Sequence, residues 1–177
     1  MGGRSLALLG GPRAAAAGYI ALVLLHGAMG TIETDFGKLL PSLATTRQVV
    51  AIEQQAHGHT ADIDGSLSYD QMVADTAALV RQLGLDNADF FGYSMGGGIG
   101  LQLAMRYPDL VRKFVWAGAA SYSLDGLYPE LMAGIAGLPG SQLAVLPGTT
   151  HVALVERVDW LVSMITAFLD APMPDAR

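Results

Sequence analysis

The sequence predicts an α/β protein, built as a three-layer α/β/α sandwich around a mainly parallel, doubly wound sheet of about five to six strands. Three observations predict this class. Short apolar runs alternate along the chain with longer segments of helical periodicity. The run Ile20–Leu25 is continuous, apolar and partly β-branched, which is typical of a central parallel strand. The 177 residues are 51% hydrophobic and 15% charged, a composition that suits one folded domain spanning residues 1–177.

The remaining elements follow from the same patterns. Further strands are expected at Arg47–Ile52, Ala88–Gly92, Lys113–Gly118 and Gln142–Leu146, with Leu6–Leu9 as an extra edge strand. Helices are expected at Thr34–Ala44, Tyr69–Leu83, Met95–Tyr107, Leu127–Ile135 and Glu156–Leu169. Gly84 ends the second of these helices and Pro108 ends the third, while Glu53–Ser68 is a polar loop. Only the ends, 1–5 and 171–177, are expected to be loose.

Composition excludes several classes of function. A net charge of -6 and the lack of a Lys/Arg cluster argue against nucleic acid as a partner. The chain has no cysteine, which removes disulfides and thiolate catalysis. No apolar run reaches the length of a membrane span, so no membrane partner is expected. Residues 1–18 have faint signal-peptide features, but Gly10-Gly11-Pro12 and Arg13 interrupt them; we expect a cytoplasmic protein, with export as the alternative.

The strongest chemical signal is Gly92-Tyr93-Ser94-Met95-Gly96, a G-x-S-x-G motif between an apolar strand and a helical segment. A β-carbon at Gly92 or Gly96 would collide with neighbouring backbone in such a tight turn. The turn lifts the Ser94 hydroxyl to the N-terminus of the next helix, where negative charge is stabilised. The pattern predicts Ser94 as a nucleophile; the alternative is a glycine-rich turn with an incidental serine. The spacing fits neither a P-loop nor a dinucleotide-binding fingerprint.

His151 is the predicted base. It is the only histidine after Ser94, and it follows an expected strand on the loop Pro147–Thr150. A base must hydrogen-bond the serine hydroxyl from the same edge of the sheet. A surface histidine is the alternative interpretation.

These motifs, together with His26-Gly27 after the first central strand and the loop Gln55–Thr60, resemble the α/β-hydrolase superfamily, in its branch of esterases, lactonases and C–C bond hydrolases. The resemblance covers roughly residues 20–121 and 141–169. It implies that the N–H groups of Ala28 (or Met29) and Met95 form an oxyanion hole. It implies a structural role for His26, and for His57 and His59 a hydrogen-bonded loop rather than zinc binding. No metal and no cofactor are expected.

The chain departs from the family pattern after Gly118, where the strand that usually carries the triad acid, and the cap, are both missing. Asp125 is the candidate acid and Glu130 the second choice; if neither serves, the site is a Ser-His dyad. The shortened chain resembles a minimal, capless core with a shallow groove lined by Met29, Tyr93, Met95 and Leu127. Such a groove would leave apolar surface exposed, which favours a homodimer.

The expected function is that of a serine esterase acting on a small-molecule ester, with small or short acyl groups, through an acyl-enzyme on Ser94. Two alternatives remain open. One is a weakly active or non-catalytic relative that binds a ligand or partner. The other is an internally shortened form of a larger C–C bond hydrolase or lactonase.

Overall fold

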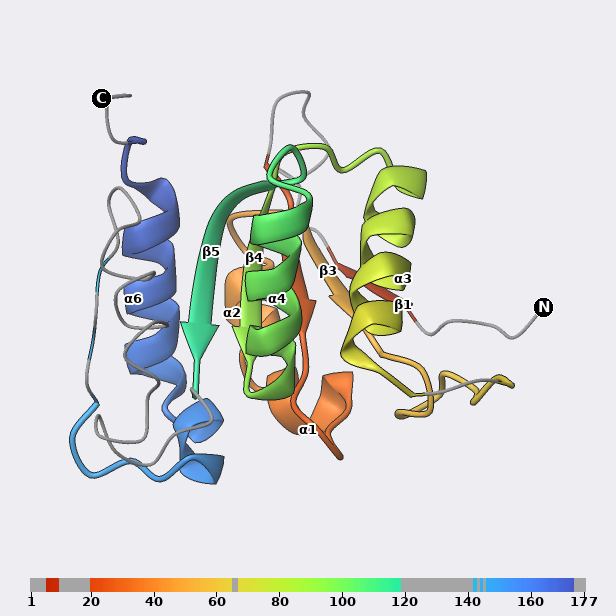
Figure 1. Ribbon diagram of the computed structural model, residues 1–177. Coiled ribbons are helices and arrows are strands. Elements are labelled where there is room, and N and C mark those ends of the chain that lie inside the picture. Colours follow the sequence, from red (N-terminus) through yellow and green to blue (C-terminus); the bar gives the residue numbers. More distant parts are fainter. Residues whose placement is uncertain are drawn as a thin grey trace, which may run out of the picture.

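The sheet has five strands in the order β1-β3-β2-β4-β5, as the computed structural model of the chain shows (Figure 1). The structure describes residues 6–9, by their backbone, and 20–64, 67–118, 142, 144 and 146–173. The strands are β1 (Leu6–Leu9), β2 (Leu22–Leu25), β3 (Val49–Ile52), β4 (Ala88–Tyr93) and β5 (Val111–Ala117). β1 runs antiparallel to β3, and the other neighbouring strands are parallel. The mainly parallel sheet and the edge strand Leu6–Leu9 are therefore confirmed.

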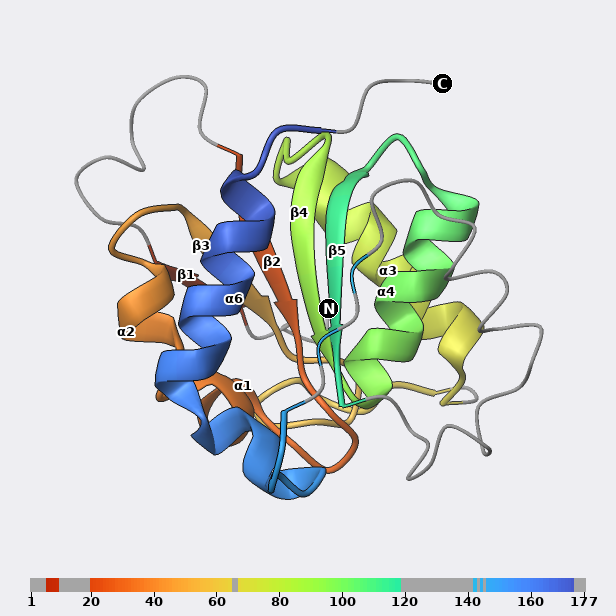
Figure 2. The same cartoon turned by 90° about the vertical axis from the view of Figure 1, so that its left-hand side faces the viewer.

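Helices cover both faces of this sheet (Figure 2). They are α1 (Ile32–Phe36), α2 (Leu40–Leu43), α3 (Tyr69–Gln82), α4 (Met95–Arg106), the 3₁₀ helix η2 (Val152–Glu156) and α6 (Val158–Asp170). In β2, Leu22 and Leu24 pack in a core with α1, α2 and α6, whereas Val23 and Leu25 pack in a second core with α3 and α4. Both faces of β2 are buried, as its uninterrupted apolar run predicted.

The expected helix Thr34–Ala44 is instead two short helices, α1 and α2. Thr31 caps α1 through its side chain, and Gly37 follows the last residue of that helix. Pro41 lies in the first turn of α2, and proline has no N–H to donate to the carbonyl four residues earlier. A continuous helix would therefore lose a hydrogen bond at this point, and the chain begins a new helix.

The expected helix Tyr69–Leu83 is confirmed as α3. Its N-cap Ser68 accepts a hydrogen bond from the Gln71 N–H through its side chain, which satisfies one of the free donors of the first turn. The residues that this helix buries are apolar except for Thr76. Four of them share the second core with residues of the strands: Met72, Val73, Ala77 and Val80.

The expected strand Gln142–Leu146 is not found in the residues of this stretch that are described. Gln142, Ala144 and Leu146 have no strand conformation, and Gln142 and Ala144 are exposed. Leu146 alone among the three packs against the core under α6. The apolar pattern predicted a buried strand, but Gln142 and Ala144 lack the burial that would stabilise them in one. The expected helix Leu127–Ile135 lies outside the described residues.

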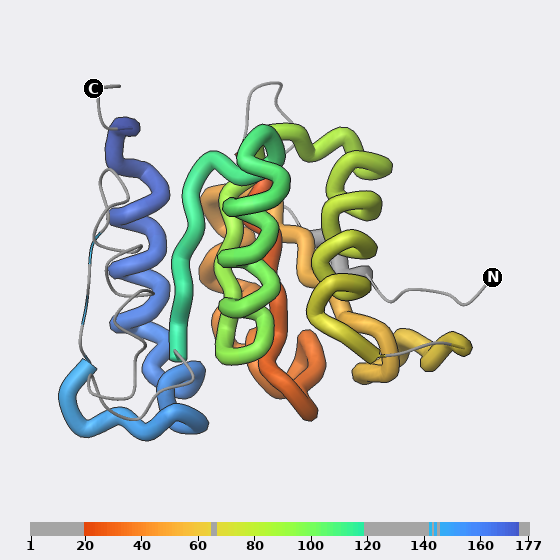
Figure 3. Tube along the Cα trace, in the orientation of Figure 1, coloured from red at the N-terminus to blue at the C-terminus, as the bar shows by residue number. Residues whose placement is uncertain are grey.

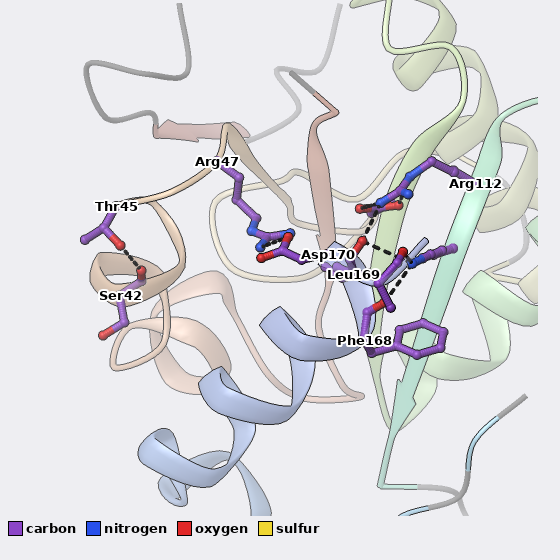
Figure 4. A network of polar contacts seen from close by, with 10 residues as sticks. Ser42, Thr45, Arg47, Arg112, Phe168, Leu169 and Asp170 are labelled. Atoms are coloured by element: carbon purple, nitrogen blue, oxygen red, sulfur yellow. Dashed lines mark hydrogen bonds and ion pairs between the residues drawn. The ribbon is translucent and has the colours of Figure 1, made fainter. Parts of the chain in front are cut away.

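The last helix, α6, is held to the sheet at its C-terminal end (Figure 4). The Lys113 ammonium donates to the carbonyls of Phe168, at 2.7 Å, and Leu169, at 3.1 Å. Arg112 also donates to the Leu169 carbonyl, at 2.9 Å, while it binds the Asp89 carboxylate of β4 through two nitrogens. Cations at the carbonyl end of a helix satisfy its free acceptors and its dipole. These contacts fix the helix that follows His151 and η2.

The strand order creates the place for a site. From β2 the chain passes to β3 on one side and then returns to β4 on the other, so the order reverses between β2 and β4. In open α/β sheets, ligands bind outside the carboxyl ends of the strands at such a point. The tube in Figure 3 shows the loops that follow β2 and β4 at the same end of the sheet. Among the described residues, no helix has the length and apolar character needed to cross a membrane.

Candidate active site

Ser94 occupies a strained turn between β4 and α4. Its φ is 52° and its ψ is -113°, a backbone conformation that residues with a side chain rarely adopt. Several backbone hydrogen bonds hold the turn. The Ser94 N–H donates to the Ala117 carbonyl of β5 at 2.9 Å, and the Ser94 carbonyl accepts from the N–H groups of Gly97 and Gly98. Strain of this kind persists only where the surroundings impose it, which marks Ser94 as a functional candidate.

The two glycines of the motif lie where no side chain fits. A β-carbon on Gly92 would lie 2.4 Å from the Gly96 carbonyl oxygen. A β-carbon on Gly96 would lie 2.0 Å from the Leu25 carbonyl oxygen at the end of β2. Backbone atoms cannot move aside as a flexible side chain can. The collision expected from the sequence is thus found at both positions, and the contact of Gly96 brings the elbow against the neighbouring strand.

His151 lies against Ser94, as the sequence predicted. Its Nε2 is 2.9 Å from the Ser94 Oγ. The loop before it is tied by Thr149, whose hydroxyl donates to the Leu146 carbonyl, and Thr150 accepts from the Ala153 N–H at the start of η2. With Nε2 accepting from the serine hydroxyl, the geometry is that of a nucleophile and its base.

Tyr93 contacts this histidine through both its hydroxyl and its ring. Its hydroxyl donates to the His151 carbonyl at 2.7 Å, and the two rings stack with centroids 5.3 Å apart. Only 6% of Tyr93 is exposed, so its position differs from the expected one in the lining of a substrate groove. A side chain at Gly118 would lie 2.9 Å from the Tyr93 ring and 3.2 Å from the His151 ring. The end of β5 therefore packs closely on both rings.

Three of the expected site residues, Asp125, Glu130 and Leu127, lie outside the described residues. Their roles as acid, second-choice acid and groove residue stay predictions.

The loop after β2 is braced by His26, which is fully buried. Its Nε2 accepts from the Gln54 N–H at 3.0 Å, so in the neutral ring the proton is on Nδ1. Nδ1 lies 2.7 Å from the Gly27 carbonyl, to which it then donates. Burial is the largest effect on this group and lowers the pKa of His26 below its usual value, which favours the neutral ring. The expected structural role of His26 fits this geometry.

The two expected oxyanion donors lie on the segments that meet at Ser94. Met95 is the first residue of α4, so its N–H has no partner within the helix. Within the described part of the chain, the Ala28 N–H donates to no other backbone carbonyl. Met29 follows with a φ of 59° and is 97% exposed.

A buried carboxylate, Glu53, ties the next loop to α1. It accepts from the N–H of His59 at 2.7 Å and from the N–H of Ile32 at 3.2 Å. Burial alone would raise the pKa of the Glu53 carboxyl, but these N–H donors and the His59 ring outweigh it and lower the pKa. His57 stacks on the His26 ring with centroids 4.9 Å apart. The loop is hydrogen-bonded as the resemblance implied.

A pocket of about 200 Å³ lies between the end of β3, the loop after it and α3. Hydrogen-bonded polar groups such as Gln54, Gln55 and Thr76 form much of its lining. Neither Ser94 nor His151 is among the residues that line it.

The strand order and the elbow define an open α/β protein whose candidate site lies at the switch point of the sheet. The chain belongs to the alpha/beta hydrolase fold family, whose model matches residues 20–156.

Among similar proteins is a pyrrolizixenacetamide deacetylase of Xenorhabdus hominickii, 34% identical over 104 residues, which are 59% of this chain and 39% of the relative. A 2-hydroxymuconate semialdehyde hydrolase of a Pseudomonas species is 32% identical over 105 residues, 58% of this chain and 37% of the relative. The enol-lactonase structure from Burkholderia xenovorans matches with a TM-score of 0.60 at 22% identity, over 66% of this chain and 44% of that one. The matches thus span less than half the length of these relatives.

Sequence reasoning missed the residues that support the site from other elements. Tyr93 was expected to line a groove, and neither Asp35 nor Glu53 was expected at the site. Asp35 accepts from the Gly27 N–H at 2.8 Å. This contact crosses a loop, and a loop has no periodic sequence pattern from which a contact could be predicted. The close glycines Gly30 and Gly58 are the only traces of these contacts in the sequence, because each leaves room for a carboxylate.

Proposed function

We propose that this protein is a serine hydrolase that cleaves small or short-chain carboxylic esters through an acyl-enzyme on Ser94. The observation that carries the proposal is the 2.9 Å contact between the Ser94 Oγ, on its strained elbow, and the His151 Nε2. An incidental serine in a glycine-rich turn would have no reason to meet a base from a distant loop. The contact equally argues against a purely ligand-binding relative.

The reaction follows from the positions of these groups. His151 takes the hydroxyl proton as the Ser94 Oγ attacks the ester carbonyl. The N–H groups of Ala28 and Met95 stabilise the oxyanion of the tetrahedral intermediate. His151 then gives the proton to the leaving alcohol, and the same steps with water in place of the serine release the acid. Tyr93 holds the His151 backbone and ring through both halves of the cycle.

The proposal is tested by hydrolysis of a short-chain nitrophenyl ester. Ser94→Ala should remove the turnover above background, since the acyl-enzyme cannot form. Ser42→Ala, an exposed serine on α2, is the matched control and should keep the wild-type rate. Unchanged turnover in Ser94→Ala would contradict the proposal.

The acid is tested separately by Asp125→Asn. If Asp125 orients His151 and stabilises the imidazolium, the rate should fall by up to about 10⁴-fold. A wild-type rate would show that Asp125 is not the acid and would leave Glu130 or a Ser-His dyad. This result would not affect the role of Ser94.

Hydrolysis of a semialdehyde is a second candidate, favoured by the identity shared with the semialdehyde hydrolase named above. The same elbow serves several reactions, so the fold alone does not choose between them. Turnover of 2-hydroxymuconate semialdehyde should be compared with that of the ester at equal enzyme concentration. A higher kcat/KM for the semialdehyde would favour the second candidate.

A further inference from the structure

Gly27 lies directly against the elbow. A β-carbon at this position would be 3.1 Å from the Tyr93 ring and 3.3 Å from the Ser94 Cβ. Glycine therefore lets the loop after β2 approach Ser94 closely. Glycine also has the greatest backbone freedom of any residue, so its own chemistry does not fix the direction of the peptide that follows. Other groups must do so if the Ala28 N–H is to point consistently at one place.

Hydrogen bonds restrain the peptides on both sides of Gly27. The Gly27 carbonyl accepts from the His26 Nδ1 at 2.7 Å and from the Gly30 N–H at 3.1 Å. This carbonyl and the Ala28 N–H belong to the same planar peptide, so fixing one directs the other the opposite way. On the other side, the Gly27 N–H donates to the Asp35 Oδ2 at 2.8 Å. The carboxylate holds the half of Gly27 that His26 does not reach.

Asp35 is itself well placed for this contact. It lies in α1, whose start is fixed by the Thr31 cap and by the Ile32 N–H bond to Glu53. The Thr34 hydroxyl donates to the second carboxylate oxygen of Asp35 at 3.2 Å. A β-carbon on Gly30 would lie 2.3 Å from the Asp35 Oδ2. The glycine at position 30 thus makes room for the carboxylate to fold back over the loop.

We propose that Asp35 is a positioning residue of the oxyanion hole, which fixes Gly27 so that the Ala28 N–H faces the oxyanion formed at Ser94. The inference rests on the proposed function of Ser94. Asp35 touches no reacting atom, and it acts only through the Gly27 N–H.

The test compares Asp35→Ala with Glu33→Ala, which removes an exposed acid from the same turn of α1. Loss of one oxyanion donor costs about 10²–10³ in rate, so a loosened donor should lower kcat by about 10- to 100-fold. KM should change little, because the donor acts mainly in the transition state. The affinity for a trifluoromethyl ketone, which forms a tetrahedral oxyanion on serine, should fall by the same factor as kcat/KM. Glu33→Ala should keep wild-type values, and Asp35→Asn, which retains an acceptor oxygen, should recover much of the loss.

A merely structural role would lower the melting temperature without separating kcat from KM. Wild-type kcat in folded Asp35→Ala, with Ser94→Ala inactive, would overturn the inference and leave the proposed function intact. An inactive wild-type protein would instead overturn the proposed function. If Asp35→Ala does not fold, Gly30→Ala replaces it, because a methyl group there displaces the carboxylate without removing its charge. A folded Gly30→Ala variant with wild-type kcat would likewise overturn the inference.

Discussion

At the level of single residues, Tyr93 makes two separate contacts with the proposed base His151, one through its hydroxyl and one through its ring. The Tyr93 hydroxyl donates to the His151 carbonyl at 2.7 Å, so the residue beside the nucleophile also holds the proposed base. The Tyr93 ring is buried against the core and stacks on the imidazole. This double contact couples the elbow to a loop that enters the site from the other end of the chain.

Tyr93→Phe tests this coupling, since it keeps the stacked ring and removes the hydroxyl. Loss of a buried hydrogen bond costs about 1 kcal/mol, and the freed His151 loop should lower kcat by about 3- to 10-fold. Tyr69→Phe, at a half-exposed tyrosine at the start of α3, is the control and should change neither stability nor rate. Equal kinetics in the two variants would show that the hydroxyl does not position His151.

The elbow, its two glycines, and the meeting of Ser94 with His151 could be predicted from sequence, because they follow from a local motif and from chain order. Asp35, Glu53 and the support given by Tyr93 could not. Their partners are backbone groups on loops brought together only by the sheet order, and an acid in a helix usually faces solvent. Pro41 is a sequence signal for the break between α1 and α2. The apolar pattern nevertheless led to the prediction of one continuous helix there.

At the scale of elements, Glu53 connects the end of β3, the loop after it and the start of α1. Only 3% of Glu53 is exposed, and backbone N–H groups from two segments bind its carboxylate. A side chain at Gly58 would collide with this carboxylate, so the loop closes on it. These contacts favour the charged form and give the interaction a pH dependence.

The pKa of Glu53 is lowered from 4.5 in the folded state, so the unfolded chain binds the proton more tightly. The stabilisation is therefore present above about pH 4.5 and is lost as the pH falls through the folded-state pKa. Glu53→Gln should lower stability at pH 7 and flatten the acid limb of a plot of unfolding free energy against pH, measured by urea titration. Glu33→Gln, at an exposed position, should leave the limb unchanged; an equally steep limb in Glu53→Gln would refute this role.

At the scale of the whole molecule, the two ends of α6 serve different purposes. Its C-terminal carbonyls bind Lys113 and Arg112 of β5, and Arg47 pairs with Asp170 at 2.9 Å (Figure 4). Its N-terminal end continues from η2 and so from His151. The sheet edge and the proposed base are thus linked through one helix, and the docking of α6 should control both stability and rate.

Lys113→Met keeps the apolar stem of this side chain and removes the charge that binds the carbonyls. The Phe168 carbonyl would lose this donor and the Leu169 carbonyl would keep only Arg112, which should cost about 2–4 kcal/mol, measured by urea unfolding. The Ser94 reaction should slow as well, because α6 no longer fixes the segment that carries His151. Lys38→Met removes an exposed lysine that pairs with exposed Glu156, a contact of small expected value. Loss of stability without any loss of rate would show that the anchoring of α6 does not position His151.

The central claim, a serine nucleophile activated by His151, is tested most directly by covalent trapping with a fluorophosphonate. We expect one adduct per chain, located on Ser94 by peptide mapping, and much slower labelling in His151→Ala because the base is missing. Labelling should be lost in Ser94→Ala and kept in Ser42→Ala. Ester turnover by a wild-type protein whose Ser94 stays unlabelled would contradict the role of Ser94 as the nucleophile.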